Sequence, residues 1–314
     1  MKINIVYIFV FLSAMGLVTA CTQDGMTDNT PLPEGSCPLG LNVSIADNGV
    51  ATRATPDGNW KGDGTESVTV GVSFDPLTKP TPYRYTVIDA DGSMTSENPY
   101  YWQNTYDNLF VWAWYPYAES LTSVGGNDDQ STEAGFQAAD RLCSDINVVL
   151  YANRQYDIEL YHITAKVVVN LVREGIMADG REAIVTLGDA RNPIYLYGSM
   201  YFLSFAPSIG DFSGFSADTD GETGFVKPLK VNAAGEYAAT YQALLIPQDI
   251  GGKKFIAVTI DGVTCYYTPP AGTYLEGGKC YTYNVTVDTS GEVTVGSIEP
   301  GEWGNGGSYD LTAQ

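Results

Sequence analysis

Apolar and polar residues alternate with a period of two along most of this chain, as they do in strands buried on one face. The first such run puts Leu41, Val43 and Ile45 on one side of a strand. Similar short runs continue to residue 287, separated by Gly, Pro and Asp. A helical period is nearly absent, apart from one or two turns near 132–141. This pattern predicts an all-β protein.

The later runs predict a series of short strands joined by turns, which is typical of β-sandwiches. The run at 156–172 changes parity near Lys166, which favours a bulge or a strand buried on both faces. We place the joint between two halves at 151–155, giving sandwiches at 41–153 and 154–314. Strands are expected at 68–72, 83–88, 110–114, 146–150, 156–172, 183–187, 194–205, 224–231, 237–246, 254–260, 265–268 and 281–287.

The first twenty residues have a different pattern, with one cation, Lys2, followed by an apolar run to Val18. This composition predicts a secretory signal peptide over 1–20. A transmembrane anchor is the alternative, but small and polar residues interrupt the second half of the run. The order Val18, Thr19, Ala20, Cys21 resembles a bacterial lipobox. We therefore expect Cys21 to be lipidated and to become the mature N-terminus.

Residues 21–40 are polar and interrupted by Pro and Gly, which predicts a tether without a core of its own. The strand at 41–45 follows, and after it comes a turn-rich stretch that carries one arginine, Arg53, followed by Ala54. Exposed turns with a basic residue are sites that trypsin-like proteases cut. We therefore predict a cleavage site between Arg53 and Ala54.

The charge of the chain excludes one class of partner. Lys and Arg number 16 and Asp and Glu 37, a formal net charge of −21 over 314 residues. Such a surface repels phosphate backbones, so a nucleic-acid partner is not expected. The acidic residues are spread along the chain and favour the solubility of an extracellular protein.

The cysteines and the single histidine offer little chemistry. No CxxC pair occurs, and His162 is alone, so no metal site and no cofactor are predicted. We expect His162 to be a hydrogen-bonded structural residue. Cys265 and Cys280 flank a Pro-Pro-Ala-Gly turn and are candidates for a disulfide, although spacing does not show whether they face each other.

Catalytic motifs are also missing, because no GxSxG, Walker loop or HExxH sequence occurs. The acidic turns at 89–93 and 218–222 are similar to calcium loops, but glycine stands at the fourth position instead of the sixth. Hairpin turns are the better interpretation. We predict that the chain is not an enzyme. A glycosidase, which needs only two carboxylates, is the third-ranked hypothesis.

An aromatic strip at Tyr100–Tyr117 contains three of the five tryptophans. Phe110, Trp112 and Trp114 alternate with smaller residues, so we expect the three rings to share one face of a strand and to fill a core. The alternative is an exposed platform on which sugars stack. That alternative makes a surface glycan-binding lipoprotein the second functional hypothesis.

Several segments occur in a fixed order along the mature chain, and no single one is specific. Together with the lipobox, Thr52-Arg53-Ala54-Thr55 and the late Trp303, the ordered set resembles the fimbrillin family, the lipoprotein subunits of type V pili. The segments are the aromatic strip, DINVVLYA at 145–152, YHITAKVVVNLV at 161–172, ALLIPQDI at 243–250 and GGKCYTYNVTV at 277–287.

The resemblance implies two tandem transthyretin-like β-sandwiches and a maturation cycle. It implies lipidation at Cys21, transport to the outer membrane surface and a cut after Arg53 that removes the strand of Leu41, Val43 and Ile45. A strand from the next subunit would fill the opened groove. The alternative for residues 41–45 is an ordinary edge strand before a loop.

The implied partners are other pilus subunits, the outer membrane through the lipid anchor, and a host or glycan ligand. In shaft subunits of the family a C-terminal strand is the donor. Val293, Val295 and Ile298 form one candidate donor, and Tyr309 with Leu311 forms the other. The short apolar tail after Trp303 weakens a shaft role and leaves tip and anchor roles open.

Overall fold

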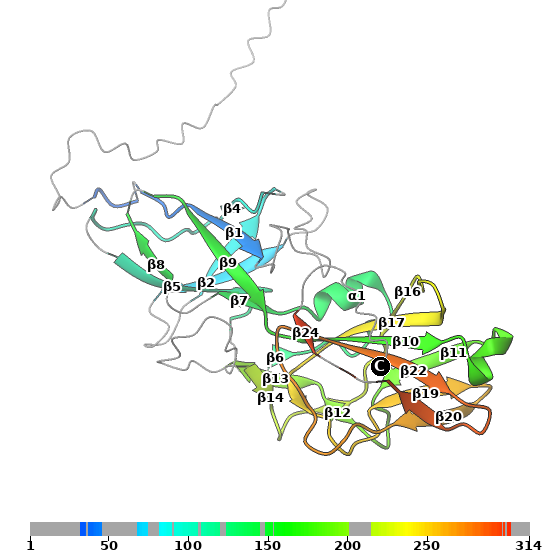
Figure 1. Ribbon diagram of the computed structural model, residues 1–314. Helices are drawn as coiled ribbons and strands as arrows, with labels where there is room; N and C mark the ends of the chain where they lie inside the picture. Colours follow the sequence, from blue (N-terminus) through cyan, green and yellow to red (C-terminus); the bar gives the residue numbers. More distant parts are fainter. Residues whose placement is uncertain are drawn as a thin grey trace, which may run out of the picture.

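The structure, a computed structural model, is nearly all β, as predicted (Figure 1). Among the described residues the helices are α1 (Glu133–Ala138) and the 3-10 helix η1 (Gly175–Asp179), and none is long and apolar enough to cross a membrane. The described residues are 32–35, 37–45, 68–74, 82–89, 91–105, 108–119, 124–144, 148–152, 154–200, 215–296, 298 and 300–302.

The first sheet surrounds a core formed by residues from the N-terminal half. Its path is β1-β9-β7-β5-β2-β3-β4, and β8 pairs with β5 beside β7. Within the described residues its eight strands are β1 (Leu41–Ile45), β2 (Thr69–Phe74), β3 (Tyr83–Val87), β4 (Met94–Thr95), β5 (Asn108–Tyr115), β7 (Leu142–Ser144), β8 (Val148–Tyr151) and β9 (Tyr156–His162).

The C-terminal half is built around a second sheet in the order β16-β17-β10-β22-β23, with β24 also on β22. Its described strands are β10 (Ala165–Val172), β16 (Leu229–Val231), β17 (Tyr237–Leu245), β22 (Lys279–Val287), β23 (Val293–Val295) and β24 (Gly301–Glu302). Smaller sheets join β11 (Ala183–Leu187), β19 (Ile256–Ile260) and β20 (Val263–Tyr267); β12 (Ile194–Tyr195) and β15 (Thr223–Gly224); β18 (Gln248–Asp249) and β21 (Tyr274–Leu275); and β6 (Val124–Gly125), β13 (Tyr197–Met200) and β14 (Phe215–Ala217).

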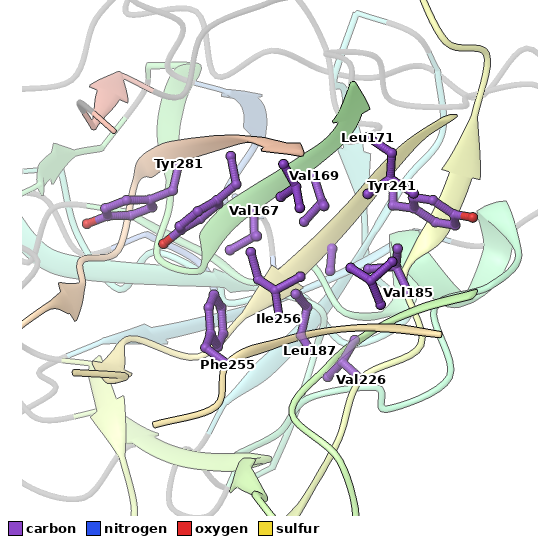
Figure 2. Close-up of a cluster of buried hydrophobic side chains, with 14 of the residues drawn as sticks. Val167, Val169, Leu171, Val185, Leu187, Val226, Tyr241, Phe255, Ile256 and Tyr281 are labelled. Atoms are coloured by element: carbon purple, nitrogen blue, oxygen red, sulfur yellow. The ribbon is translucent and has the colours of Figure 1, made fainter. Parts of the chain in front are cut away.

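The second sheet packs on β11 and β19 to form a sandwich core. Figure 2 shows Val167, Val169 and Leu171 from β10 directed toward side chains of the facing layer. Alternate residues of β10 and β22 are buried, as their period-two sequences predict. The side chains of this core are aliphatic and aromatic, so their burial stabilises the C-terminal half.

A third core joins the two halves. Trp112 and Trp114 of β5 lie outside the first core and pack with three other residues, Ile163, Phe215 and Ile246. The prediction that all three rings fill a core is wrong for Phe110, which is 53% exposed. Strand β5 is buried on both faces at 111–114, because Val111 and Ala113 face the first core. Burial of the tryptophans was predicted correctly.

The predicted strand at 156–172 is two strands in different sheets. Strand β9 pairs with β1 and β7, whereas β10 pairs with β17 and β22. The chain changes sheet at Ile163 and Thr164, about ten residues after the predicted joint at 151–155. Alternation alone does not show which sheet a strand joins. The division into two separate sandwiches stays a prediction, since the tryptophan core connects the halves.

His162 lies at this change of sheet and is structural, as predicted. It is 8% exposed, and its Nδ1 lies 3.0 Å from Oδ1 of Asp140, which is also buried. The Thr164 hydroxyl donates to the same oxygen at 3.4 Å. Arg141 donates to the carbonyl oxygen of Gly125, and burial lowers the pKa of its guanidinium. These bonds fix the crossing between the halves.

Cys265 and Cys280, the candidates for a disulfide, are not bonded to each other. Both are unbonded thiols, and they lie on strands of different sheets, β20 and β22. The Sγ of Cys265 lies 3.3 Å from the position of a Cβ on Gly291, in the hairpin after β22. Cys280 is at the opposite end of β22, about 23 Å from Val287 along an extended strand. A disulfide needs Cα atoms within about 7 Å.

We expect Gly71→Ala to destabilise the protein by about 1–3 kcal/mol, because a Cβ there would lie 2.3 Å from Cε2 of the buried Trp114. The matched control is Gly296→Ala, where no atom lies within 4 Å of the new methyl group. Urea unfolding of both variants measures the difference. Equal stability losses would contradict the packing of Trp114 on Gly71.

Candidate functional site

The first strand is the most unusual element of the fold, because it is one end of its sheet and also contacts the other end, beside β4. On one flank β1 pairs in parallel with β9, from Leu41 opposite Tyr156 to Ile45 opposite Leu160. On the other flank the Val43 amide donates to the Gly92 carbonyl oxygen at 2.8 Å, just before β4. Strand β1 therefore closes the first sheet and covers two edges that would otherwise be open.

The inward side chains of β1 belong to the first core. Leu41 and Val43 are each 1% exposed and Ile45 is 5% exposed. Asn42 is half-buried and Ser44 is exposed on the opposite face. The predicted alternation of this strand is confirmed, because its three apolar residues are buried in the first core. We refer to the place that β1 occupies between β9 and Gly92 as the groove.

The segment before β1 is also packed, which corrects the predicted tether at 21–40. Leu32, Cys37 and Leu39 are buried in the same core as β1. The Leu32 amide donates to Gln103 and the Leu39 amide to Tyr100, both at backbone oxygens. The polar composition of 21–40 conceals these three apolar anchors. Any tether is therefore confined to residues before Leu32.

The energy held by this segment is large compared with ordinary protein stability. Full burial of an aliphatic side chain contributes about 1.5–3 kcal/mol. Five aliphatic side chains of the segment are buried, so together they contribute several times this free energy. The typical free energy of unfolding of a whole protein is about 5–15 kcal/mol. The five residues are Leu32, Leu39, Leu41, Val43 and Ile45. The segment 32–45 is therefore an integral part of the first core.

Gly92 makes the close approach of β1 possible. Its φ is +81°, in the left-handed region that favours glycine. A Cβ on Gly92 would lie 1.9 Å from the Val43 carbonyl oxygen. The residue belongs to the predicted hairpin turn at 89–93, where Asp89 Oδ1 accepts from the amides of Asp91 and Ser93. Among the described residues no acidic cluster that could hold a metal ion is found.

Polar contacts around the groove lie on its outward side. Asn42 Nδ2 donates to Asp157 Oδ1 at 2.8 Å, and Gln155 Nε2 donates to Asn42 Oδ1 at 2.8 Å. In the core below, burial raises the pKa of Tyr85 to about 12, although the Tyr100 amide donates to its hydroxyl. The groove is thus apolar inside and hydrogen-bonding outside. This arrangement suits a strand in which apolar and polar residues alternate.

The predicted lipidation and cleavage residues and one of the two candidate donors lie outside the residues that the structure describes. Cys21, Arg53, Ala54, Tyr309 and Leu311 lie outside the described residues. The other candidate donor is occupied, because Val293 and Val295 form β23 on β22 of the same chain and Ile298 packs against the second core. The groove residues contributed by Gly92 and β9 were not predicted. Their only sequence signals are a turn glycine and an alternating strand.

The aromatic strip is not an exposed platform of tryptophans. Trp102, Trp112 and Trp114 are 2%, 4% and 1% exposed. Tyr101 is half-buried, so Phe110 is the exposed large hydrophobic residue of the described strip. Buried indole rings cannot stack on a sugar. The strip is therefore structural in the part of the chain that the structure describes.

Comparison with known proteins decides the family. The profile of the family described as Fimbrillin-like matches residues 52–303, most of the chain. The chain belongs to the fimbrillin-like family. A search of curated proteins finds no match to this fimbrillin-like chain.

Solved structures with a similar fold come from Bacteroides. A candidate cell adhesion protein of Bacteroides ovatus is 19% identical, with 83% of this chain and 96% of that chain covered and a TM-score of 0.55. A second candidate cell adhesion protein, of Bacteroides uniformis, is 16% identical over 87% of this chain and 100% of that chain, also with a TM-score of 0.55. At these identities the likeness establishes the fold.

Family membership supports a pilus or adhesin subunit at the cell surface and points to a structural role instead of a catalytic one. The matched region begins at Thr52, next to Arg53, and omits the segment 32–45 that fills the groove. The segment 32–45 thus precedes the matched region and lies outside it.

We expect Gly92→Ala to lower the free energy of unfolding by more than backbone strain alone, because it disturbs the contact with β1. Gly272→Ala is the matched control, because Gly272 has a φ of +82° and no atom within 4 Å of a new Cβ. The control should lose about 1–2 kcal/mol from the left-handed conformation. Gly92→Ala should lose about 1–3 kcal/mol more, because the Val43 carbonyl must move.

Urea unfolding gives both values. Equal losses at Gly92 and Gly272 would show that the contact with Val43 does not constrain the groove.

Proposed function

We propose that this fimbrillin-like chain is a structural or adhesive subunit of a type V pilus, assembled by strand exchange. In this proposal Cys21 carries the lipid anchor that holds the precursor at the outer membrane. Cleavage after Arg53 then releases the segment that contains β1. The observation that carries the proposal is the position of β1, which fills the first core and joins both ends of the sheet.

Three features support exchange of this strand. Its contacts with the sheet are backbone pairing on two flanks and three alternate apolar side chains, which another strand can reproduce. The family match starts beside Arg53 and excludes β1. An emptied groove would expose unpaired strand edges, which promote association with a strand of another chain. The proposed partners are therefore other pilus subunits.

The C-terminal half supports a donor other than β23. Strand β23 and Ile298 are held by the second sheet and its core, so their release would open that core too. Glycan binding is not favoured as a second function, because the tryptophans of the aromatic strip are buried. A host or glycan ligand on another surface remains a separate proposal.

Mild trypsin treatment of the full chain should cut after Arg53 and yield a resistant core that begins at Ala54 and forms SDS-stable multimers. Arg53→Gln should abolish both results, because the segment then stays covalently attached to its groove. Arg191→Gln, at an exposed arginine in the C-terminal half, is the matched control and should behave as wild type. N-terminal mass analysis and unheated SDS gels give the readout.

A core that is cut at Arg53 yet stays monomeric would argue against strand exchange between copies. Multimers from uncut Arg53→Gln would argue against cleavage as the trigger.

Cys21→Ser should move the precursor from the membrane fraction to the soluble fraction, because a single thiol carries the lipid in the proposed lipobox. Cys265→Ser is the control, since Cys265 is a half-buried thiol of the C-terminal half and should leave the anchor intact. Membrane fractionation and intact-mass measurement of the lipid check the result. Membrane retention of Cys21→Ser would refute lipidation at this residue.

A further inference from the structure

We infer that the groove selects an incoming strand with basic side chains at the two outward positions now held by Asn42 and Ser44. The inference rests on the proposed strand exchange and adds the chemistry of the partner. The incoming strand would alternate apolar residues, which replace Leu41, Val43 and Ile45, with Lys or Arg. Its occupant is thus a strand of another subunit.

The first argument is the outward face of β9. Asp157 lies opposite Asn42, and Glu159 lies opposite Ser44. Both carboxylates are exposed and belong to the strand that any incoming strand must pair with. Neighbouring strands lie about 4.7–4.9 Å apart, so side chains at paired positions on one face are close neighbours. Their partners therefore determine part of the affinity.

The second argument is how β1 itself meets these carboxylates. Asn42 places its amide donor on Asp157 Oδ1 at 2.8 Å, while Gln155 binds the amide oxygen from the other side. The resident strand thus offers a hydrogen-bond donor to the acidic position. A basic side chain offers a donor and the opposite charge at the same position.

The other flank of the groove is acidic as well. Gly92, whose carbonyl oxygen binds the Val43 amide, follows Asp91 in the turn that begins at Asp89. The side chain of Asp91 is exposed. Carboxylates thus stand along both flanks, in a chain whose formal net charge is −21. An acidic strand would meet repulsion from both sides.

The charge preference bears on a second copy of this chain as donor. In the stretch Tyr309–Ala313 the apolar positions alternate with Asp310 and Thr312. If Tyr309 took the position of Leu41, Asp310 would face Asp157. The chain is therefore a poor donor to itself in this register, and a subunit with a basic donor strand is preferred.

The first test measures the charge preference within the full, uncut chain. At low salt, the equilibrium constant for unfolding should be about three- to tenfold smaller for Ser44→Lys than for Ser44→Asp. The gap should shrink when Glu159→Gln is added, and also in 1 M salt, where the Debye length is about 3 Å. Urea unfolding of each variant gives these constants.

Matched controls correct for the general effect of charge on an acidic protein. Thr264→Lys and Thr264→Asp change an exposed strand position opposite the neutral Thr259, on the β19–β20 hairpin. Their gap should be smaller than the gap at Ser44. An equal gap at Thr264, or a gap at Ser44 that Glu159→Gln does not reduce, would overturn the inference.

The second test uses the trypsin-cut full chain and fluorescent peptides. One peptide has the sequence of residues 32–45, and two others have Lys or Asp at the positions of Asn42 and Ser44. The Lys peptide should bind at least about tenfold more tightly than the Asp peptide. A peptide of residues 305–314 tests the second copy as donor and should be captured weakly.

The outcomes separate the two proposals. Capture of the Lys and Asp peptides with equal affinity, or tight capture of the 305–314 peptide, would overturn the charge preference and leave strand exchange standing. Capture of none, including the native sequence, would overturn strand exchange itself, whatever the result at Ser44.

Discussion

Strand β1 lies between β9 and the turn at Gly92, and the N-terminal half of the molecule depends on this position. Its backbone pairs with β9 on one flank and reaches Gly92 on the other, while Leu41, Val43 and Ile45 complete the core. Backbone pairing and apolar burial are both generic, because any alternating strand supplies them. In the proposed strand exchange, another alternating strand would therefore take the place of β1 without a change of fold.

The two halves of the chain differ in which segments cover the edges of their sheets. The second sheet keeps β23 and β24 on the outer edge of β22, and the tryptophan core fixes β5 against the C-terminal half. The first sheet is completed by a segment that precedes a predicted cleavage site. The groove therefore belongs to a half that is anchored through Trp112 and Trp114 and does not rely on β1 to hold the halves together.

Much of this fold could be predicted from alternation alone. The buried face of β1, the short helix near residue 133 and strands such as β3, β11 and β17 were predicted because turns and parity are local signals. Sheet membership is not local, which is why β9 and β10 were read as one strand. The burial of Leu32 and Leu39 was missed because both lie in a polar stretch and pack against distant residues. The partners of β1 likewise required the structure.

Net charge and local charge act on assembly at different ranges. A chain with a formal net charge of −21 repels its own copies, but at physiological salt this repulsion is screened beyond about 8 Å. Subunits can therefore approach despite their acidity, and long-range charge selects no partner. Asp157 and Glu159 act within that distance, directly beside the strand that occupies the groove. In the proposed exchange, selection by charge is consequently confined to the step in which a strand pairs with β9, where register also decides which side chains meet.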